Sequence, residues 1–244
     1  MNWTLHLPQI SFSFNEPIPE KQLILAAGGR EPQGEWLTKA CAQRDIWCVD
    51  RGIDSCWKNQ ILPKRMIGDG DSASSEGWQW GRTLGIPIEE HPKEKNLTDL
   101  QLALNRAGDI HPRAAVILTG VWGGRFDHAF SNIYTLLGST AWGIQRACAA
   151  DEKEVLLLLK GKEEVAIKAE PLPSLISLLP LSESCTGVSI EGVHWPLHQV
   201  ILSQGLPYAV SNRPSGQKDE INVSVETGWL GVYLCWDEKS ICQK

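Results

Sequence analysis

The 244-residue sequence lacks the features of a membrane or exported protein. No stretch approaches the roughly 18 consecutive apolar residues that a membrane-spanning helix needs, and the first residues, MNWTLHLPQISFSF, contain no basic region followed by an apolar one. The seven cysteines form no CxxC pair and are odd in number, which does not suit the disulfide framework of a secreted protein. We therefore expect a cytoplasmic protein with no membrane partner.

Runs of lysine and arginine are also missing, and the formal net charge is −6. Binding to a nucleic-acid backbone depends on clustered cations, so we expect no nucleic-acid partner. Hydrophobic residues make up 42% and charged residues 21% of the chain. These fractions are close to those of ordinary globular proteins, and they argue against a disordered or fibrous chain.

The chain has two halves of different texture. In residues 1–150, short apolar runs alternate with amphipathic segments, which predicts a parallel sheet with helices between its strands. The expected strands are 22–27, 45–50, 65–69 and 114–120. A capping-box pattern at Thr98 and Gln101 predicts the start of a helix. In residues 151–244, apolar runs are separated only by turn residues, which predicts an all-β domain, either a sandwich or a barrel.

Several aspartates lie where the predicted parallel strands end. Asp50 follows the second strand, and Asp69 and Asp71 follow the third in the stretch IGDGDS. Asp99 opens the predicted helix. Ligands of open parallel sheets bind beyond the carboxyl ends of the strands, and converging carboxylates repel one another unless a cation lies among them. Because Mg²⁺ accepts a few carboxylates together with water and phosphate oxygens, the pattern indicates a magnesium site; a plain Asp-Gly turn is the alternative.

A second candidate site is the stretch TGVWGGRFDHAFSN at residues 119–132. It runs from a predicted strand through Gly123 and Gly124 into a helix, and it brings backbone N–H groups, a helix N-terminus and Arg125 to one place. Such an arrangement is typical of an anion-binding loop. A tight turn followed by a surface arginine is the simpler interpretation of this stretch alone. Together with the aspartates, however, it favours chemistry on nucleotide phosphates.

The order of these motifs resembles the thiamine pyrophosphokinase family. IGDGDS is similar to the family's GDxDS loop, PKEKNLTDLQLAL to its KDxTDxxxAL segment, and GGRFDHAFSN to its GGRxDHxxxN loop. TGVSIEGVHWPL and the pair Ser211-Asn212 resemble two further family segments downstream. The similarity covers most of residues 22–236 in the family's order.

The resemblance implies a Rossmann-like α/β domain at 1–150 that binds ATP and Mg²⁺, and a β-sandwich domain at 151–244 that binds thiamine. It implies a homodimer with active sites between the subunits. It also implies transfer of the pyrophosphoryl group of ATP to the hydroxyl of thiamine, which gives thiamine diphosphate and AMP. The related alternatives are a diphosphokinase acting on another small alcohol, such as a hydroxymethyl pterin, and a non-catalytic protein that binds the nucleotide or thiamine.

The resemblance also assigns roles to residues. The predicted magnesium ligands are Asp69, Asp71 and Asp99. The predicted catalytic residues are Asp71, Asp99, Arg125 and Asp127. The predicted ATP and phosphate contacts are Asp50, Asp69, Thr98, Gly123, Gly124, Arg125 and Asn132. The predicted thiamine contacts are Ser211, Asn212 and Trp195.

The sequence departs from the family pattern at two positions. The family has Asp-Gly-Gly after the second strand, whereas this chain has Asp50-Arg51-Gly52. Asn96 stands where the family has the first acid of KDxTD. Arg51 therefore either narrows the pocket or adds a phosphate contact, and Asn96 removes one negative charge. The remaining aspartates lead us to expect that activity survives.

Overall fold

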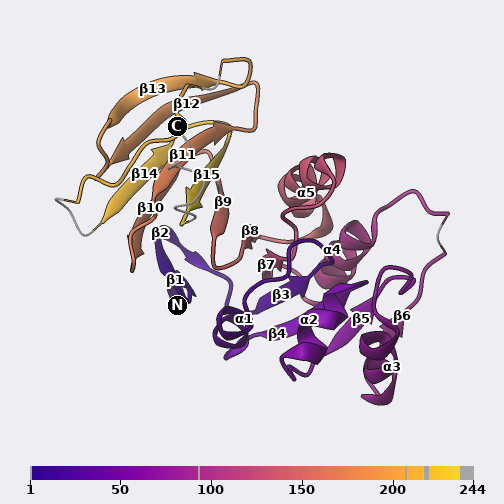
Figure 1. The fold of residues 1–244 in the computed structure, drawn as a ribbon. Coiled ribbons are helices and arrows are strands. Elements are labelled where there is room, and N and C mark those ends of the chain that lie inside the picture. Colours follow the sequence, from indigo (N-terminus) through magenta and orange to yellow (C-terminus); the bar gives the residue numbers. More distant parts are fainter. Residues whose placement is uncertain (1, 93, 207, 217–219, 237–244) are drawn as a thin grey trace. The chain divides into compact units, whose positions relative to one another are not determined.

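The computed structural model describes residues 2–92, 94–206, 208–216 and 220–236. The chain divides into two compact units. The α/β unit is Pro19–Asp151, and the β unit combines Met1–Ile18 with Glu152–Lys244. Figure 1 shows the helices gathered in the first unit and long strands in the second.

The α/β unit is built on six parallel strands in the order β8-β7-β3-β4-β5-β6. Their bounds are β3 (Gln22–Ala26), β4 (Asp45–Val49), β5 (Arg65–Ile67), β6 (Ile88–Glu89), β7 (Ala115–Thr119) and β8 (Arg146–Ala150). Every residue of β7 and β8 is buried, as expected for parallel strands covered on both faces. The chain moves outward from β3 to β6 and then returns to the other side of β3 with β7, so the strand order reverses between β3 and β7.

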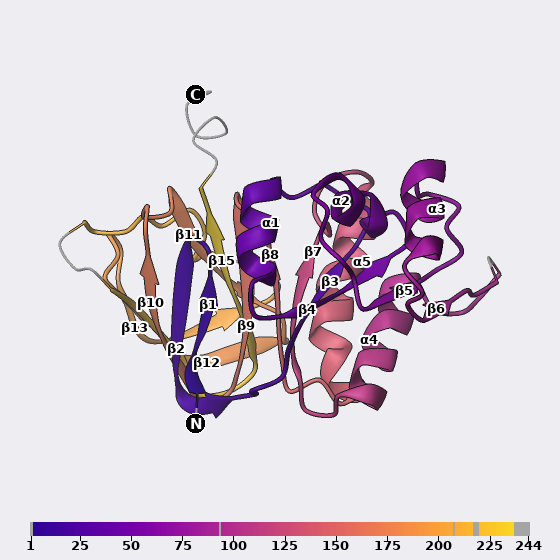
Figure 2. The same cartoon turned by 90° about the horizontal axis from the view of Figure 1, so that it is seen from below.

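Helices cover both faces of this sheet. They are α1 (Gly34–Cys41), α2 (Gly52–Lys58), α3 (Ser75–Thr83), α4 (Asp99–Ile110), α5 (Phe126–Gly138) and the short 3₁₀ helix η1 (Ser139–Trp142). Figure 2 shows α4 and α5 on one face and α1 and α2 on the other. The predicted capping box is confirmed, because the Thr98 hydroxyl accepts from Gln101 N and the Gln101 side chain accepts from Thr98 N. Leu100, Ala103 and Leu104 then bury one face of α4.

In its described residues, the regular structure of the β unit consists of strands paired antiparallel. One sheet has the order β1-β2-β10-β14-β12-β13, and a second run has the order β11-β15-β9. The bounds are β1 (Asn2–Leu7), β2 (Ile10–Ile18), β9 (Glu154–Lys160), β10 (Glu163–Ala169), β11 (Leu175–Pro180), β12 (Ser184–Glu191), β13 (Leu197–Ser203), β14 (Ile221–Val225) and β15 (Trp229–Cys235). Alternate residues of β14 are buried, the pattern of an antiparallel sheet with one face on the core.

Residues 1–18 correct the predicted domain boundary, which placed them in the first domain. They form β1 and β2 of the β unit, where β2 pairs antiparallel with β10. The physical reason is the alternation in ISFSF: Ile10, Phe12 and Phe14 are buried, whereas the serines between them are not. A period of two suits a sheet with one buried face, and such a strand finds its partners in the antiparallel unit.

None of the helices in the described residues combines the length and the apolar character that crossing a membrane requires. The six cysteines in the described part of the chain form no disulfide.

Candidate active site

The reversal of strand order places a cavity of about 360 Å³ beyond the carboxyl ends of β3, β4 and β7. This is the position at which open parallel sheets bind ligands. Seven of the predicted site residues line the cavity: Asp50, Thr98, Asp99, Gly123, Gly124, Arg125 and Asn132. Ser72, His128 and Ser131 also line it; they lie within the quoted motifs but received no predicted role.

One wall of the cavity consists of glycine backbone. Gly29 N donates to Gly120 O at 2.6 Å, so the loops after β3 and β7 lie directly against each other. A Cβ atom at Gly29 would come within 2.5 Å of Gly120 O, and one at Gly120 within 2.2 Å of Ala27 O. Gly123 and Gly124 have φ of +74° and +71°, a region that side chains rarely adopt. The loops can approach this closely only because both positions of the contact are glycine.

Arg125 lies at the start of α5 and is held by Asp127. The Arg125 Nε donates to Asp127 Oδ1 at 3.0 Å, and Nη2 donates to Oδ2. This hydrogen bond raises the pKa of Arg125 and lowers that of Asp127. Both side chains are exposed, so the pair contributes little to stability but fixes the direction of the guanidinium. Asn132 braces the same loop, because its Nδ2 donates to Val121 O at 2.9 Å.

Asp50 holds the IGDGDS loop from within. Its Oδ1 accepts from Asp69 N at 3.1 Å and from Gly70 N at 3.4 Å. A Cβ atom at Gly68 would lie 1.8 Å from this oxygen, so only glycine fits there. Burial, followed by the negative charge of Asp99, raises the pKa of Asp50 to about 7. The influence of Asp99 and Asp69 on this pKa reflects carboxylates that lie close together, as the sequence predicts.

Lys95 lies among these carboxylates. Its Nζ is 2.8 Å from Asp99 Oδ1 and 3.7 Å from Asp69 Oδ2. Burial opposes the charge of Lys95, but the two carboxylates outweigh it and raise the lysine pKa. Asp99 Oδ1 is itself buried and accepts no hydrogen bond of favourable geometry. Its partner is the charge of Lys95. Lys95 was quoted in the KDxTD segment but received no predicted role.

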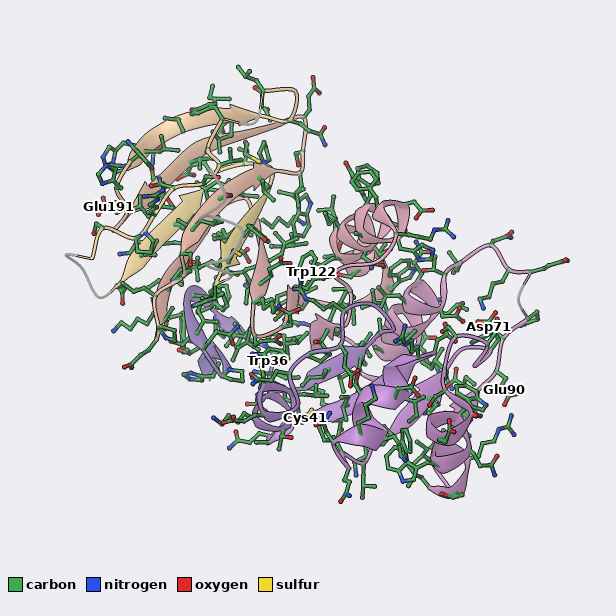
Figure 3. The ribbon with its side chains drawn as sticks, viewed as in Figure 1. Trp36, Cys41, Asp71, Glu90, Trp122 and Glu191 are labelled. Atoms are coloured by element: carbon green, nitrogen blue, oxygen red, sulfur yellow. The ribbon has the colours of Figure 1, made fainter. Side chains whose placement is uncertain are left out.

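Asp71 lies at the surface of the α/β unit (Figure 3). Its backbone N–H donates to Asp69 Oδ1 at 3.1 Å. Within the described residues, no three acidic, histidine or cysteine side chains are arranged so that they could hold a metal ion. The structure therefore brings Asp69 and Asp99 to one cation and leaves Asp71 outside that pair, so the three-ligand magnesium site stays a prediction.

Two buried carboxylates that the sequence analysis missed support the loops. Asp54 accepts from the Ser74 backbone at 3.0 Å and from the Ser74 hydroxyl at 2.6 Å, which anchors the end of the IGDGDS loop. Asp151 is fully buried and accepts from Arg30 Nε at 2.9 Å and Nη2 at 2.6 Å. Arg30 and Asp151 are far apart in sequence, so no local pattern indicates the pair.

The predicted thiamine residues gather in the β unit. Trp195 and Asn212 line an apolar cavity of about 190 Å³ together with Ile176, Leu178, Ile190, Leu197 and Tyr208. The Asn212 side chain accepts from Trp195 N at 3.1 Å and donates to Trp195 O at 2.7 Å. Ser211 is adjacent, with φ of +58° and its N–H donating to Ser177 Oγ at 3.0 Å. Asn212 therefore fixes the loop that carries the exposed Trp195 ring.

Comparisons with known proteins identify the family of the chain. A family model of the thiamin pyrophosphokinase catalytic domain matches residues 39–145, and a model of the thiamin pyrophosphokinase vitamin B1 binding domain matches residues 163–230. Thiamine pyrophosphokinase of Bacillus subtilis (strain 168) is 26% identical over 193 residues, which cover 79% of this chain and 89% of that protein. Thiamine pyrophosphokinase 2 of Oryza sativa subsp. japonica is 25% identical over 178 residues, 70% of this chain and 66% of that protein.

The fold is similar to that of a solved structure. The crystal structure of thiamine pyrophosphokinase from Bacillus subtilis superposes with a TM-score of 0.78 at 23% identity. The superposition covers 89% of this chain and 100% of the crystallised one.

Proposed function

Because the chain belongs to the thiamin pyrophosphokinase family, we propose that it transfers the pyrophosphoryl group of ATP to the hydroxyl of thiamine. The thiamine oxygen bonds to the β-phosphorus, the bond from that phosphorus to the α-phosphate oxygen breaks, and AMP leaves. The observation that carries the proposal is the cavity at the strand-order reversal, where glycine backbone and Arg125 face Asp50 and Asp99. A second cavity with an exposed tryptophan, in the β unit, supports it.

The finer features of the fold belong to the same proposal. The parallel order with its reversal between β3 and β7 supports a Rossmann-like α/β unit. The two antiparallel runs of strands in the β unit support a β-sandwich.

We assign nucleotide binding to the α/β cavity. The loops at Gly29 and Gly120 through Gly124 present backbone to it, and this backbone can approach phosphate oxygens closely. Arg125, held in direction by Asp127, neutralises negative charge that develops on the transferred group. Asp50 and Asn132 keep the two loops in place, and Thr98 lies at the edge as the cap of α4. Positioning and charge neutralisation of this kind account for most catalysis in phosphoryl transfer.

The carboxylates fit a magnesium ion. Asp69 and Asp99 already share one cationic partner, and the buried Asp99 oxygen lacks a well-directed hydrogen bond. Hard cations take such oxygen ligands. We propose that Asp69 and Asp99 hold Mg²⁺ with ATP, with Asp71 joining them from its surface position. When bound, the ion would neutralise part of the triphosphate charge.

We place thiamine in the β-unit cavity, against Trp195. The ring is 56% exposed and offers a face to the cationic thiazolium. The apolar lining suits a flat heterocycle. Because both polar ends of the Asn212 amide bind the Trp195 backbone, the structure supports a positioning role for Asn212.

A homodimer belongs to the proposal as well. Phe126, Phe130 and Tyr134 lie four residues apart on α5 and are 81%, 51% and 42% exposed. Their rings contact each other in sequence, with centroids 5.9 Å and 4.9 Å apart. A continuous exposed aromatic surface of this kind marks an interaction site. It begins beside Arg125, so a second copy bound there would border the nucleotide cavity.

The function is tested by incubating the protein with ATP, Mg²⁺ and separate alcohols. We expect AMP and thiamine diphosphate in equal amounts with thiamine, measured by liquid chromatography, and neither product without it. AMP formed only with a hydroxymethyl pterin would show that the pterin, and not thiamine, is the acceptor. Binding of ATP and thiamine by calorimetry without any AMP would show a non-catalytic protein.

A further inference from the structure

We propose that Arg51 is a second phosphate-binding cation of the nucleotide site, and this inference rests on the proposed use of ATP. Its place is the rim of the α/β cavity. Arg51 directly follows Asp50, which lines the cavity, and forms the N-cap of α2. The position corresponds to a glycine in the pattern of the family that the sequence resembles, so the contact would be particular to this chain.

The backbone geometry at Arg51 allows a side chain there without strain. Its φ and ψ are −56° and −14°, an ordinary right-handed helical conformation. The preceding residue, Asp50, takes the left-handed turn instead, with φ of +45°. A glycine is therefore not needed at position 51, and an arginine costs the fold nothing in backbone conformation.

The first carbons of the Arg51 side chain lie beside Gly28, a residue of the cavity wall. A Cβ atom placed on Gly28 would lie 2.7 Å from Arg51 Cβ and 3.6 Å from Arg51 Cγ. Gly28 itself lines the cavity. The stem of Arg51 therefore packs against Gly28, and the missing side chain of Gly28 provides the room for it. From this position beside Gly28 and Asp50, the flexible end of the arginine can extend toward the cavity.

The charge of Arg51 is uncommitted, unlike that of the neighbouring cations. Lys95 is paired with Asp99, Arg125 with Asp127, and Arg30 with Asp151. Arg51 is exposed and, within the described residues, has neither a hydrogen-bond nor an ion-pair partner for its side chain.

A nucleoside triphosphate would provide the partner that the charge of Arg51 lacks. The cavity presents the carboxylates of Asp50 and Asp99 to a ligand that is itself strongly negative, so each additional cation lowers the repulsion. A guanidinium binds phosphate oxygens through two parallel hydrogen bonds and retains its charge at any working pH. Arg51 is therefore expected to bind the phosphates beyond the α-phosphate, from the side of the cavity formed by Gly28.

The test compares Arg51→Ala with Lys64→Ala. Lys64 is another exposed cation of the α/β unit with no side-chain partner in the described residues, but it precedes β5 and so lies at the opposite, amino end of the strands. Calorimetry with Mg²⁺ would measure the dissociation constants of AMP, ADP and α,β-methylene-ATP, an analogue that cannot release AMP. We expect Arg51→Ala to weaken the analogue about tenfold, the typical effect of one charge-assisted hydrogen bond, and to change AMP binding less than about twofold. Lys64→Ala should match the wild type.

Equal analogue binding by Arg51→Ala and the wild type would overturn the inference, as would an equal loss for AMP and the analogue. Arg51→Lys keeps the charge but lacks the two parallel donors of the guanidinium. Its affinity for the analogue should lie between those of the wild type and Arg51→Ala. The proposed function fails separately: if the wild type makes no AMP from thiamine but its analogue binding depends on Arg51, only the acceptor is wrong. If the wild type does not bind the analogue, both proposals fail.

Discussion

Arg125 is the residue whose substitution separates catalysis from binding most clearly. It borders the proposed nucleotide cavity, whereas the proposed thiamine residues belong to another unit. Arg125→Ala should lower kcat by about a hundredfold or more, because stabilisation of charge that develops in the transition state contributes roughly 3 kcal/mol. The thiamine KM should change much less. Steady-state kinetics would measure both, and circular dichroism would confirm the fold. Asp127→Asn, which removes only the orienting partner, should have a smaller effect. An unchanged kcat for Arg125→Ala would make it a surface charge.

Asp50 should make stability depend on pH. Its pKa is raised from 3.8 to about 7, mainly by burial and then by Asp99. The folded protein therefore keeps a proton that the unfolded chain has lost, so this stabilisation is complete below about pH 4 and disappears as the pH rises through about 7. Asp50→Asn stays neutral, and relative to the wild type it should gain on the order of 1 kcal/mol between about pH 5 and pH 8, a value reduced for partial solvent screening.

Urea unfolding at the two pH values, without magnesium, would measure this gain. Asp109→Asn, which removes an exposed carboxylate from α4, controls for the loss of one charge. If Asp50→Asn and the wild type respond to pH in parallel, the carboxyl of Asp50 does not titrate as its surroundings indicate.

At the residue scale, the sequence indicated which carboxylates lie close together but not which cation pairs with them. Asp50, Asp69 and Asp99 could be placed together because each follows a predicted strand or opens a predicted helix. The position of Lys95 between Asp69 and Asp99 depends on how the loop before α4 folds back, and no periodicity encodes that path. For the same reason the surface position of Asp71 could not be predicted from its spacing to Asp69.

Secondary-structure elements were predictable where local physics is strong. The strands β3 and β7 are mainly apolar runs with a glycine within two residues of their ends, and α4 has a complete capping box. The two-residue strand β6 lies within the strand-like stretch IPIEEH, but its short length depends on its pairing with β5. The pairing of β2 with β10 joins segments about 150 residues apart. The alternation of residues in β2 can be seen in the sequence, but its partner strand cannot.

The loop after β3 depends on a buried ion pair that can be tested at the element scale. Arg30→Met removes a partner of the fully buried Asp151. Removing one partner of a buried ion pair costs roughly 3 kcal/mol, so the free energy of unfolding should fall by about that amount. Lys39→Met breaks the pair with Glu35, in which both side chains are mostly exposed, and should cost less than about 1 kcal/mol. Chemical unfolding of both variants would measure the contrast, and equal small losses would show that the Arg30 pair is screened by solvent.

At the scale of the whole molecule, the aromatic surface of α5 predicts self-association. Phe130 is the middle of the three exposed rings and contacts both others. Phe130→Glu would place a charge in that surface, so we expect it to convert a dimer of 27.0 kDa chains into monomers. Sedimentation velocity would measure the mass. Leu62→Glu, at another exposed apolar residue of the α/β unit, should leave the dimer intact. A wild-type monomer, or a Phe130→Glu dimer, would contradict the assignment.

Whether each active site combines two subunits can be decided by mixing inactive variants. If the nucleotide cavity of one subunit works with the thiamine cavity of its partner, Arg125→Ala and Trp195→Ala damage different halves of the site. In a heterodimer of the two, one site collects both substitutions and the other collects neither. Subunits exchanged at equal amounts should therefore recover about a quarter of the wild-type activity, since half of the dimers are mixed and each has one intact site. A mixture of Arg125→Ala with Asp99→Asn, both in the α/β unit, should recover none, because every site then receives its nucleotide half from a damaged subunit. Recovery absent from both mixtures, with heterodimers isolated by two affinity tags, would place each complete site within a single subunit.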